Sequence, residues 1–242
     1  YYKKEQKELK IEHKEYKSLV SVADRETENA IKSHISSSFP DSEFITEEAD
    51  NTTIDFRKVW IIDPIDGTRE FLKGIDYWSI LLAYARSEEI IVGVCYFPVL
   101  NILLFAEKGK GAYANDSRVK VSETNELSRA FVSYNSLSGG FQPRETDAIL
   151  DMIWGTESSR SFNSSFSAYC VCSGRVDIFI GNSRTKIWDI APFVCIAKEA
   201  GGRITDWEGK EISIRDDSAP SILTNGILHE EILRAVGKVG IL

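Results

Sequence analysis

Six short apolar segments follow one another between residues 59 and 121, and most of the connections between them are only a few residues long. The segments are 59–62, 79–85, 90–97, 102–106, 112–114 and 119–121. Turn-forming residues separate several of them, for example at 98–101 and 115–117, which is typical of strands joined by hairpins. A parallel crossover needs about a dozen residues or more. The segments are therefore predicted to pair as antiparallel neighbours in one sheet.

The second half of the chain has a different rhythm. Helices are predicted at 144–154, 164–173, 189–200 and 228–236, with strands at 176–180, 202–205 and 221–224. In the first half, a helix is predicted at 25–38, with Asp24 as its N-cap. No Pro-rich or Ser-rich linker separates the halves. We therefore predict an N-terminal α+β subdomain at 1–125 and a C-terminal α/β subdomain at 126–242, which form one rigid unit with a cleft at their junction.

The charge of the chain restricts its partners. The 242 residues include 29 Lys and Arg against 37 Asp and Glu, which gives a formal net charge of −8. This balance argues against a nucleic-acid polymer or an anionic membrane surface as partner. No apolar stretch reaches the roughly 20 residues that a transmembrane helix needs. The expected partner is therefore a small molecule that is held by a local group of residues.

The N-terminal segment and the cysteines bear on the setting of the protein. The first 18 residues are rich in Lys and Glu, and we predict an exposed lead-in or a helix without its partner. Because the chain begins with Tyr1, we expect the native N-terminus to be missing. Cys95, Cys170, Cys172 and Cys195 lie in apolar segments at spacings that match neither a zinc site nor a disulfide framework. We interpret them as reduced core thiols of a cytoplasmic protein.

Two carboxylates follow directly on the apolar strand 59–62. Asp63 and Asp66 are separated by Pro64, which fixes φ, and are followed by Gly67, which permits a tight turn. Both carboxylates and the Ile65 carbonyl can therefore converge on one point. Hard oxygen ligands without histidine favour Mg²⁺, Mn²⁺ or Ca²⁺ over zinc. The alternative from these residues alone is a capping turn or a salt-bridged loop.

Two further acidic segments have ordinary explanations when each is taken by itself. Asp189 lies where the helix at 189–200 begins and is predicted to be its N-cap. A helix N-terminus also suits an anion, and a carboxylate there can ligate a cation. Glu47 and Glu48 follow an apolar pair, and alone they would form a solvated face. The three acidic segments are informative only when they are considered together.

Together, residues 44–48, 60–68 and 188–191 resemble the signatures of the inositol monophosphatase superfamily, and the match runs in order from residue 18 to residue 202. Members are Mg²⁺-dependent, lithium-sensitive phosphatases. The resemblance implies an α+β or α/β fold, a layered αβαβα sandwich of two subdomains of the inositol monophosphatase and fructose-1,6-bisphosphatase type. Members begin with a further N-terminal helix, and we expect that helix to belong to the missing part of the chain.

The resemblance also implies roles for individual residues. Glu47, Asp63 and the Ile65 carbonyl match the ligands of a first metal ion, and Asp63, Asp66 and Asp189 match those of a second. Two or three Mg²⁺ ions are expected at each site, with Mn²⁺ as a possible replacement. Thr68 matches the threonine that holds the nucleophilic water, Asp24 the acid that holds this threonine, and Glu47 the residue that helps to activate the water. Glu48 matches the second acid of its pair. The residues expected to contact substrate are Glu47, Ile65, Asp66, Gly67, Thr68, Ser164, Ser165 and Asp189.

The identity of the substrate depends on two segments that point in different directions. Residues 66–71 resemble the D-G-T-K-E-F motif of bacterial 3'(2'),5'-bisphosphate nucleotidases, which favours adenosine 3',5'-bisphosphate. Residues 163–167 depart from the G-S-S-L-K segment of those enzymes, because Asn163 replaces the glycine and Ser167 the lysine. The alternatives are an inositol-1-phosphate or histidinol-phosphate phosphatase and, in another class, a non-catalytic protein that binds a phosphate ligand. Monomer and homodimer are both open.

Overall fold

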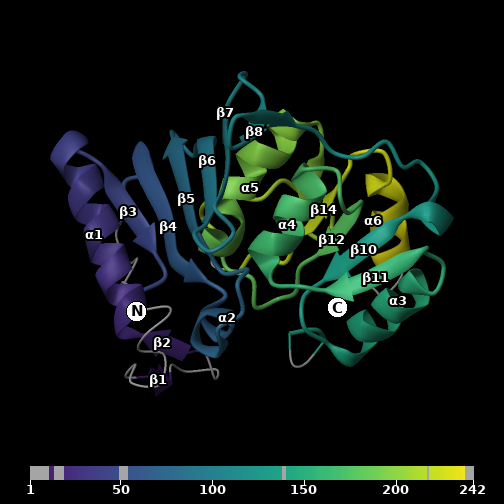
Figure 1. Ribbon diagram of the computed structural model, residues 1–242. Coiled ribbons are helices and arrows are strands. Elements are labelled where there is room, and N and C mark those ends of the chain that lie inside the picture. Colours follow the sequence, from purple (N-terminus) through teal and green to yellow (C-terminus); the bar gives the residue numbers. More distant parts are fainter. Residues whose placement is uncertain (1–10, 14–18, 49–53, 138–139, 217, 238–242) are drawn as a thin grey trace.

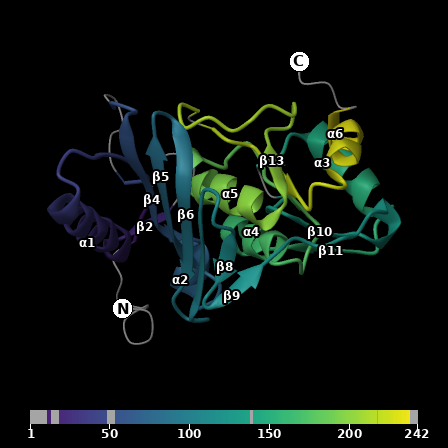
Figure 2. The same ribbon diagram turned by 90° about the horizontal axis from the view of Figure 1, so that it is seen from above.

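The protein is built of five layers. The computed structural model describes residues 11–13, 19–48, 54–137, 140–216 and 218–237. Across Figure 1, helix α1 (Val22–Ser38) is followed by the larger sheet, by helices α4 (Ser164–Cys172) and α5 (Ile187–Ala200), by the smaller sheet and by helices α3 (Pro143–Ile153) and α6 (His229–Gly237). The view from above in Figure 2 shows the same succession. This arrangement confirms the predicted αβαβα sandwich.

The larger sheet contains every strand predicted in the first half of the chain. Its order is β3 (Glu43–Thr46), β4 (Lys58–Asp66), β5 (Ser79–Arg86), β6 (Glu89–Phe97), β7 (Ile102–Glu107), β8 (Ala112–Ala114) and β9 (Ser117–Val119). All neighbours from β4 to β9 are antiparallel, as predicted, whereas β3 pairs with β4 in parallel. The last strand was predicted too late, at 119–121. Asn115 adopts a positive φ of 51° in a two-residue turn, so the return strand begins directly at Ser117.

The smaller sheet mixes parallel and antiparallel pairs. Its order is β11 (Ser158–Ser161), β10 (Phe131–Tyr134), β12 (Ile178–Ile180), β14 (Ile222–Thr224) and β13 (Arg203–Thr205). Strand β10 is parallel to both β11 and β12, and the other two pairs are antiparallel. Neither β10 nor β11 was predicted. Strand β11 is polar and partly exposed and therefore gives no apolar signal. The two sheets lie on either side of residue 125, while the division into two subdomains stays a prediction.

Two helix starts differ from the sequence prediction. Helix α1 begins at Val22, so Asp24 lies inside its first turn and is fully buried instead of capping it. Helix α5 begins at Ile187, after Lys186 as its N-cap residue, and Asp189 accepts a hydrogen bond from the Lys186 N–H at 2.8 Å. Asp189 therefore still caps α5, but from the third position of the helix and not from its N-cap.

Three other short elements were not predicted. Helix α2 (Thr68–Lys73) is bounded by Gly67 and Gly74, both with positive φ. Strands β1 (Ile11–His13) and β2 (Leu19–Ser21) form an antiparallel pair, so these parts of the N-terminal segment are not helical. The other residues of the predicted lead-in at 1–18 lie outside the described residues. In the described part of the chain, no helix is long and apolar enough to cross a membrane.

One hydrophobic core joins the two sheets through α5. Its members include Ile61 and Leu81 of the larger sheet, Phe193 of α5 and Phe179 of the smaller sheet. Helix α5 lies so close to β6 that a Cβ atom at Gly93 would be 2.1 Å from the Pro192 carbonyl oxygen. Glycine at this position therefore lets the helix backbone rest on the strand.

All four cysteines are buried and unpaired in the structure, as predicted for core thiols. Burial raises the pKa of Cys170 and of Cys195 to about 11. Both thiols are therefore protonated and weakly nucleophilic at neutral pH, which leaves them a packing role.

The buried imidazole of His229 has a defined tautomer. Its Nε2 lies 2.9 Å from Thr205 Oγ1, whose hydroxyl proton is donated to the Asp206 carbonyl, so Nε2 carries the hydrogen. Its Nδ1 lies 3.0 Å from Thr224 Oγ1, which accepts from the Gly226 N–H and donates its own proton to Nδ1. Burial, followed by the nearby Arg203 charge, lowers the pKa of His229 from 6.5 to about 4. The ring is therefore neutral in the folded protein.

This neutral histidine makes stability depend on pH. Below about pH 6.5 the unfolded chain binds a proton at His229, while the folded chain does not until the pH nears 4. The contribution of neutral His229 to the free energy of unfolding is therefore full above about pH 6.5 and is lost as the pH falls toward 4. The loss is about 3 kcal/mol at most. Denaturant unfolding of wild type and His229→Gln should be measured at pH 7, 5.5 and 4.5. The difference in the free energy of unfolding between the two proteins should become smaller as the pH falls. His34→Gln, at an exposed position, is the matched control, and a pH-independent difference for His229→Gln would contradict the assignment.

Candidate metal centre

The acidic residues of the first half meet at one edge of the larger sheet. Strands β3 and β4 are parallel, so their carboxyl ends lie side by side. Glu47 directly follows β3, and its N–H donates to the Ile62 carbonyl of β4 at 3.3 Å. Asp63 is the next residue along β4. This pairing explains why Glu47 and Asp63 come together although 16 positions separate them in the sequence.

Strand β4 continues through the acidic residues with an irregularity. Asp63 pairs with Leu81 and Asp66 with Ser79, and the register shifts between these two pairs. The Ile65 N–H donates to Asp63 Oδ1 at 3.0 Å, which fixes the Asp63 carboxylate. A shift of this kind re-aims side chains locally. Asp63 and Asp66 are thus part of the strand, whereas the sequence predicted a strand that ends before them, at residue 62.

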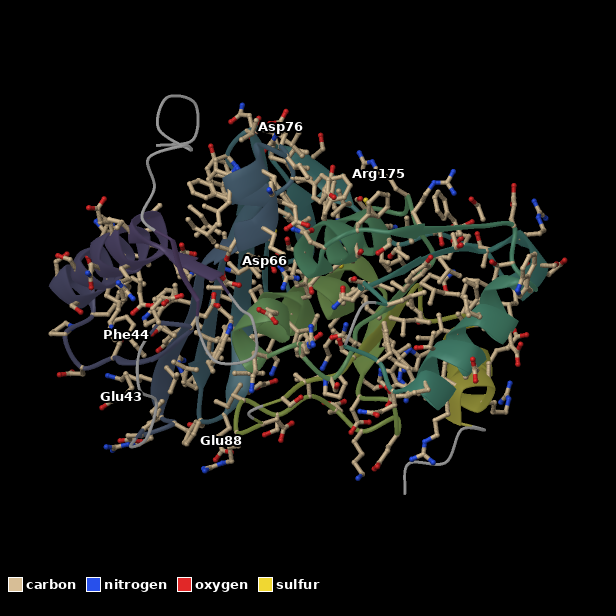
Figure 3. All side chains as sticks on the ribbon, turned by 90° about the horizontal axis from the view of Figure 1, so that it is seen from below. Glu43, Phe44, Asp66, Asp76, Glu88 and Arg175 are labelled. Atoms are coloured by element: carbon tan, nitrogen blue, oxygen red, sulfur yellow. The ribbon has the colours of Figure 1, made fainter. Side chains whose placement is uncertain are left out.

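Asp66 is held from the second half of the chain. Ser165 of α4 donates to Asp66 Oδ2 through both its N–H, at 3.3 Å, and its hydroxyl. Ser165 is fully buried, and its hydroxyl also contacts that of Ser79 at 2.8 Å. In Figure 3, Asp66 lies inside the molecule, whereas the exposed residues Glu43 and Glu88 lie at its edge.

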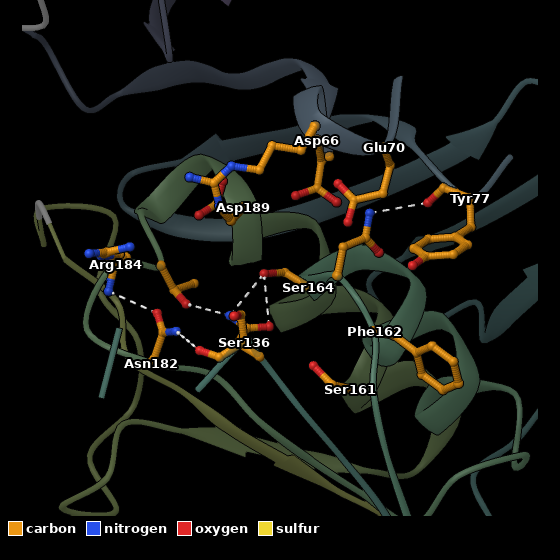
Figure 4. Close-up of a pocket in the computed structure, with 15 residues that line it drawn as sticks. Asp66, Glu70, Tyr77, Ser136, Ser161, Phe162, Ser164, Asn182, Arg184 and Asp189 are labelled. Atoms are coloured by element: carbon orange, nitrogen blue, oxygen red, sulfur yellow. Dashed lines mark hydrogen bonds between the residues drawn. The ribbon is translucent and has the colours of Figure 1, made fainter. Parts of the chain in front are cut away.

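Asp189 completes a group of three carboxylates. It enters from α5, and one ligand atom each from Asp63, Asp66 and Asp189 lies within 4.8 Å of the others. Figure 4 shows Asp66 and Asp189 next to one another at the edge of a pocket. A strand, the irregular end of that strand and a helix more than 120 residues later therefore place three oxygen ligands within 4.8 Å of one another.

The environment of these carboxylates calls for a cation. Burial, and then the negative charges of Glu47, Asp66 and Asp189, raise the pKa of Asp63 well above its usual range. Burial and the charges of Asp66 and Glu47 likewise raise the pKa of Asp189. Burial raises the pKa of Asp66 to about 6 although the Ser165 hydrogen bonds lower it. A divalent ion would restore the ionised state of all three. Since the donors are hard oxygens, they fit Mg²⁺ or Mn²⁺.

A polar pocket of about 290 Å³ opens beside the three carboxylates. Three parallel strands end at it: Asn135 and Ser136 follow β10, Phe162 and Asn163 follow β11, and Asn182 and Arg184 follow β12. Its other wall includes Arg69, Glu70 and Tyr77 from α2 and the segment after it. The carboxyl ends of parallel strands are the usual place for a ligand. The pocket offers amides, hydroxyls and two arginines to the part of a ligand that lies beyond the metal.

Apart from Glu47, Asp63 and Ile65, which are described above, the predicted site residues fall into two groups. Asp66, Gly67, Ser164 and Asp189 line this pocket. Four others are placed behind it or at its margin. Asp24 is fully buried in α1, Ser165 is fully buried beneath Asp66, Thr68 begins α2 and donates to the Ile65 carbonyl at 3.3 Å, and Glu48 donates through its N–H to a buried glutamate at 3.1 Å.

The two departures from the nucleotidase pattern also have defined places. Asn163 caps α4, accepting from the Phe166 N–H at 3.0 Å, and its amide donates to the Tyr77 carbonyl at 3.1 Å. Ser167 is fully buried and does not line the pocket. The serine at the expected lysine position therefore faces the interior.

Several residues near the site were missed by the sequence analysis. The buried glutamate that accepts from the Glu48 N–H is Glu28 of α1. Glu28 could have been recognised in the sequence because it lies four residues after Asp24, a spacing that puts both side chains on one helical face. Asn135, Asn182 and Arg184 could be found only once the parallel pairing of β10, β11 and β12 was known, because their segments carry no acidic or glycine-rich motif.

Comparisons with known proteins agree with this geometry. A family model described as the inositol monophosphatase family matches residues 1–240. A fructose-1,6-bisphosphatase/inositol-1-monophosphatase of Thermotoga maritima is 38% identical over 93% of this chain and 84% of its own. A histidinol-phosphatase of Mycobacterium tuberculosis is 32% identical over 93% and 87%. The solved structure of the extragenic suppressor protein suhB from Bartonella henselae superposes with a TM-score of 0.89 at 30% identity, covering 98% of this chain and 91% of that one.

Proposed function

This chain belongs to the inositol monophosphatase family, and from that premise we propose that it is a Mg²⁺-dependent phosphomonoesterase. The observation that carries the proposal is the convergence of Asp63, Asp66 and Asp189 within 4.8 Å at the edge of a polar pocket. The family is metal-dependent, and the three carboxylates fit a hard divalent ion. The substrate is a small phosphate ester, whose phosphate would be held through the metal that the carboxylates bind and whose organic part would lie in the pocket.

Each acidic residue has a proposed task in hydrolysis. Bound Mg²⁺ lowers the pKa of water and neutralises the charge that otherwise repels an anionic nucleophile from a phosphate monoester. Asp63 would be shared between two ions, with Glu47 and the Ile65 carbonyl on one side and Asp66 and Asp189 on the other. Glu47 would accept the proton of the nucleophilic water. These assignments are our proposal for residues that the fold brings to one edge.

The residues around Gly67 have positioning tasks. Thr68 would orient the nucleophilic water, with buried Asp24 behind it, and the N–H groups of Gly67 and Thr68 would hold the phosphate. Glycine is required at this corner, since a Cβ on Gly67 would lie 2.6 Å from Asn163 Nδ2 and its φ is +83°. Ser164 would contact the substrate directly. Ser165 would act through its hydrogen bonds to Asp66.

For the organic part of the substrate, we favour a polyol phosphate such as inositol 1-phosphate. The names of the relatives, fructose-1,6-bisphosphatase/inositol-1-monophosphatase and histidinol-phosphatase, support small hydroxylated or amino-alcohol esters. The pocket agrees in character, because Asn135, Asn182 and Ser164 offer hydrogen bonds to hydroxyl groups.

Adenosine 3',5'-bisphosphate is the second candidate. The motif at residues 66–71 favours it, and Arg69 and Arg184 line the pocket where a second phosphate could bind. Ser167 provides no such contact because it faces the interior.

Phosphate release by the purified protein tests the proposal. Inositol 1-phosphate, fructose 1,6-bisphosphate, histidinol phosphate and adenosine 3',5'-bisphosphate are compared side by side with Mg²⁺ and with EDTA. We expect release that EDTA abolishes, fastest with a polyol phosphate and inhibited by millimolar Li⁺. A preference for the nucleotide would keep the metal centre and change the substrate. No release from any ester would instead favour a non-catalytic protein that binds a phosphate ligand.

A further inference from the structure

Glu28 reaches the residues around Glu47 from the layer of α1, which covers the face of the larger sheet opposite α4 and α5 (Figure 1). It belongs to α1, one helical turn after Asp24, and is 5% exposed. Residues four apart share a helical face, so α1 directs two buried carboxylates toward the carboxyl ends of β3 and β4. Asp24 already has a proposed task next to Thr68. Glu28 has none.

The Glu28 carboxylate binds both neighbours of Glu47. Oε1 accepts from the Thr46 hydroxyl at 3.0 Å, and Oε2 accepts from the Glu48 N–H at 3.1 Å. Lys32 Nζ lies 3.5 Å from Oε1 on the solvent side. Because the Glu28 carboxylate accepts hydrogen bonds from the residues on both sides of Glu47, it restrains the backbone at Glu47. The Glu47 N–H is in turn bound to the Ile62 carbonyl.

We propose that Glu28 is a positioning residue of the metal centre, which acts through the backbone on either side of Glu47 and sets where the Glu47 carboxylate meets Asp63. The inference rests on the proposed metal-dependent function. Its physical basis is general, since mutation of residues that orient a metal ligand through hydrogen bonds typically lowers metal affinity about 10- to 100-fold. Without the Glu28 carboxylate, the turn after β3 loses the hydrogen bonds from Thr46 and Glu48, and the position of Glu47 relative to Asp63 is less well fixed.

The test measures metal binding directly. Calorimetric titration of the metal-free protein with Mn²⁺ should show that Glu28→Ala raises the Kd about 10- to 100-fold, and Glu28→Gln less, because one acceptor oxygen remains. Glu26→Gln is the matched control, since Glu26 lies on the same helix, has the same charge and is exposed. Its Kd should equal that of wild type. Thermal unfolding of each metal-free variant confirms that it is folded.

A second pair of variants separates positioning from general support of the fold. In the Glu47→Gln background, Glu28→Gln should have little further effect on the Mn²⁺ Kd, because the two changes remove the same contribution. Thr46→Val removes one Glu28 contact while leaving both acids, and it should raise the Kd in the same direction. It also serves if Glu28→Ala does not fold.

The outcomes distinguish the two proposals. Wild type that fails to bind Mn²⁺ would overturn the metal-dependent function and, with it, the role of Glu28. Wild type that binds Mn²⁺ while Glu28→Gln and Thr46→Val bind it equally well would overturn the role of Glu28 alone. Additive effects of Glu28→Gln and Glu47→Gln would also overturn it, since they would show that Glu28 does not act through Glu47.

Discussion

Asp63→Asn lowers phosphate release by at least about 10²- to 10³-fold, which is the largest effect we expect from a single substitution. Asp63 is the residue proposed to be shared between two ions, so its loss weakens both sites at once. Asparagine keeps the oxygen that accepts from the Ile65 N–H, and the local backbone should therefore remain in place. Asp116→Asn, at an exposed turn position, is the control and should behave as wild type.

The same substitution has a second, independent readout. In the metal-free protein, Asp63 is buried among Glu47, Asp66 and Asp189, whose charges raise its pKa. Replacing it with a neutral residue should leave the metal-free melting temperature unchanged or higher, while the increase in melting temperature on adding Mg²⁺ disappears. Near wild-type phosphate release by Asp63→Asn, or an undiminished Mg²⁺ stabilisation, would refute the assignment of the metal centre.

Gly93→Ala destabilises the fold by about 1–3 kcal/mol or more, the usual cost of overpacking a core. A Cβ at this position would meet the Pro192 carbonyl oxygen at 2.1 Å, and that oxygen belongs to the backbone of α5 and cannot rotate away. Helix α5 must shift, and Asp189 shifts with it because it lies three residues before Pro192. Denaturant unfolding should report the loss of stability. Titration with Mn²⁺ should report a weaker site in the protein that remains folded.

A matched glycine separates this effect from that of any added methyl group. A Cβ at Gly155 would lie 3.4 Å from its nearest neighbour, the Met152 carbonyl oxygen, which is an ordinary contact. Gly155→Ala should therefore change stability by less than about 0.5 kcal/mol or increase it slightly. Equal stability of Gly93→Ala and Gly155→Ala would show that α5 can move without cost.

Local patterns in the sequence were sufficient for much of the larger sheet. Strand β5 alternates buried and less buried residues along its length, and short turns fix the antiparallel order of its neighbours. The acids Asp63, Asp66 and Asp189 were recognised by motif, and the structure brings them together. These features depend on neighbours in the sequence, which is why they could be predicted.

The features that were missed depend on contacts between distant segments. Strand β11 has the sequence Ser-Ser-Arg-Ser and becomes a strand only because β10 pairs with it. Asp24 and Asp189 have side chains suited to an N-cap, but both helices begin two residues earlier, and Asp189 caps α5 from inside its first turn. Ser165 was expected to touch substrate, yet its hydroxyl is bound to Asp66 behind the pocket. The local sequence around these residues does not show whether a strand forms, where a helix begins or whether a serine contacts the substrate.

The origin of the three carboxylates has a consequence for how the two halves of the molecule hold together. Asp63 and Asp66 belong to the larger sheet, whereas Asp189 belongs to a helix packed against it from the second half. Without a cation, ionising these carboxylates costs free energy across this junction, as their raised pKa values show. A bound divalent ion offsets that cost and adds about 2.7 kcal/mol at a concentration 100 times its Kd. Local opening of the junction, measured by hydrogen exchange in β4 and α5, should therefore slow together in both elements when metal is added.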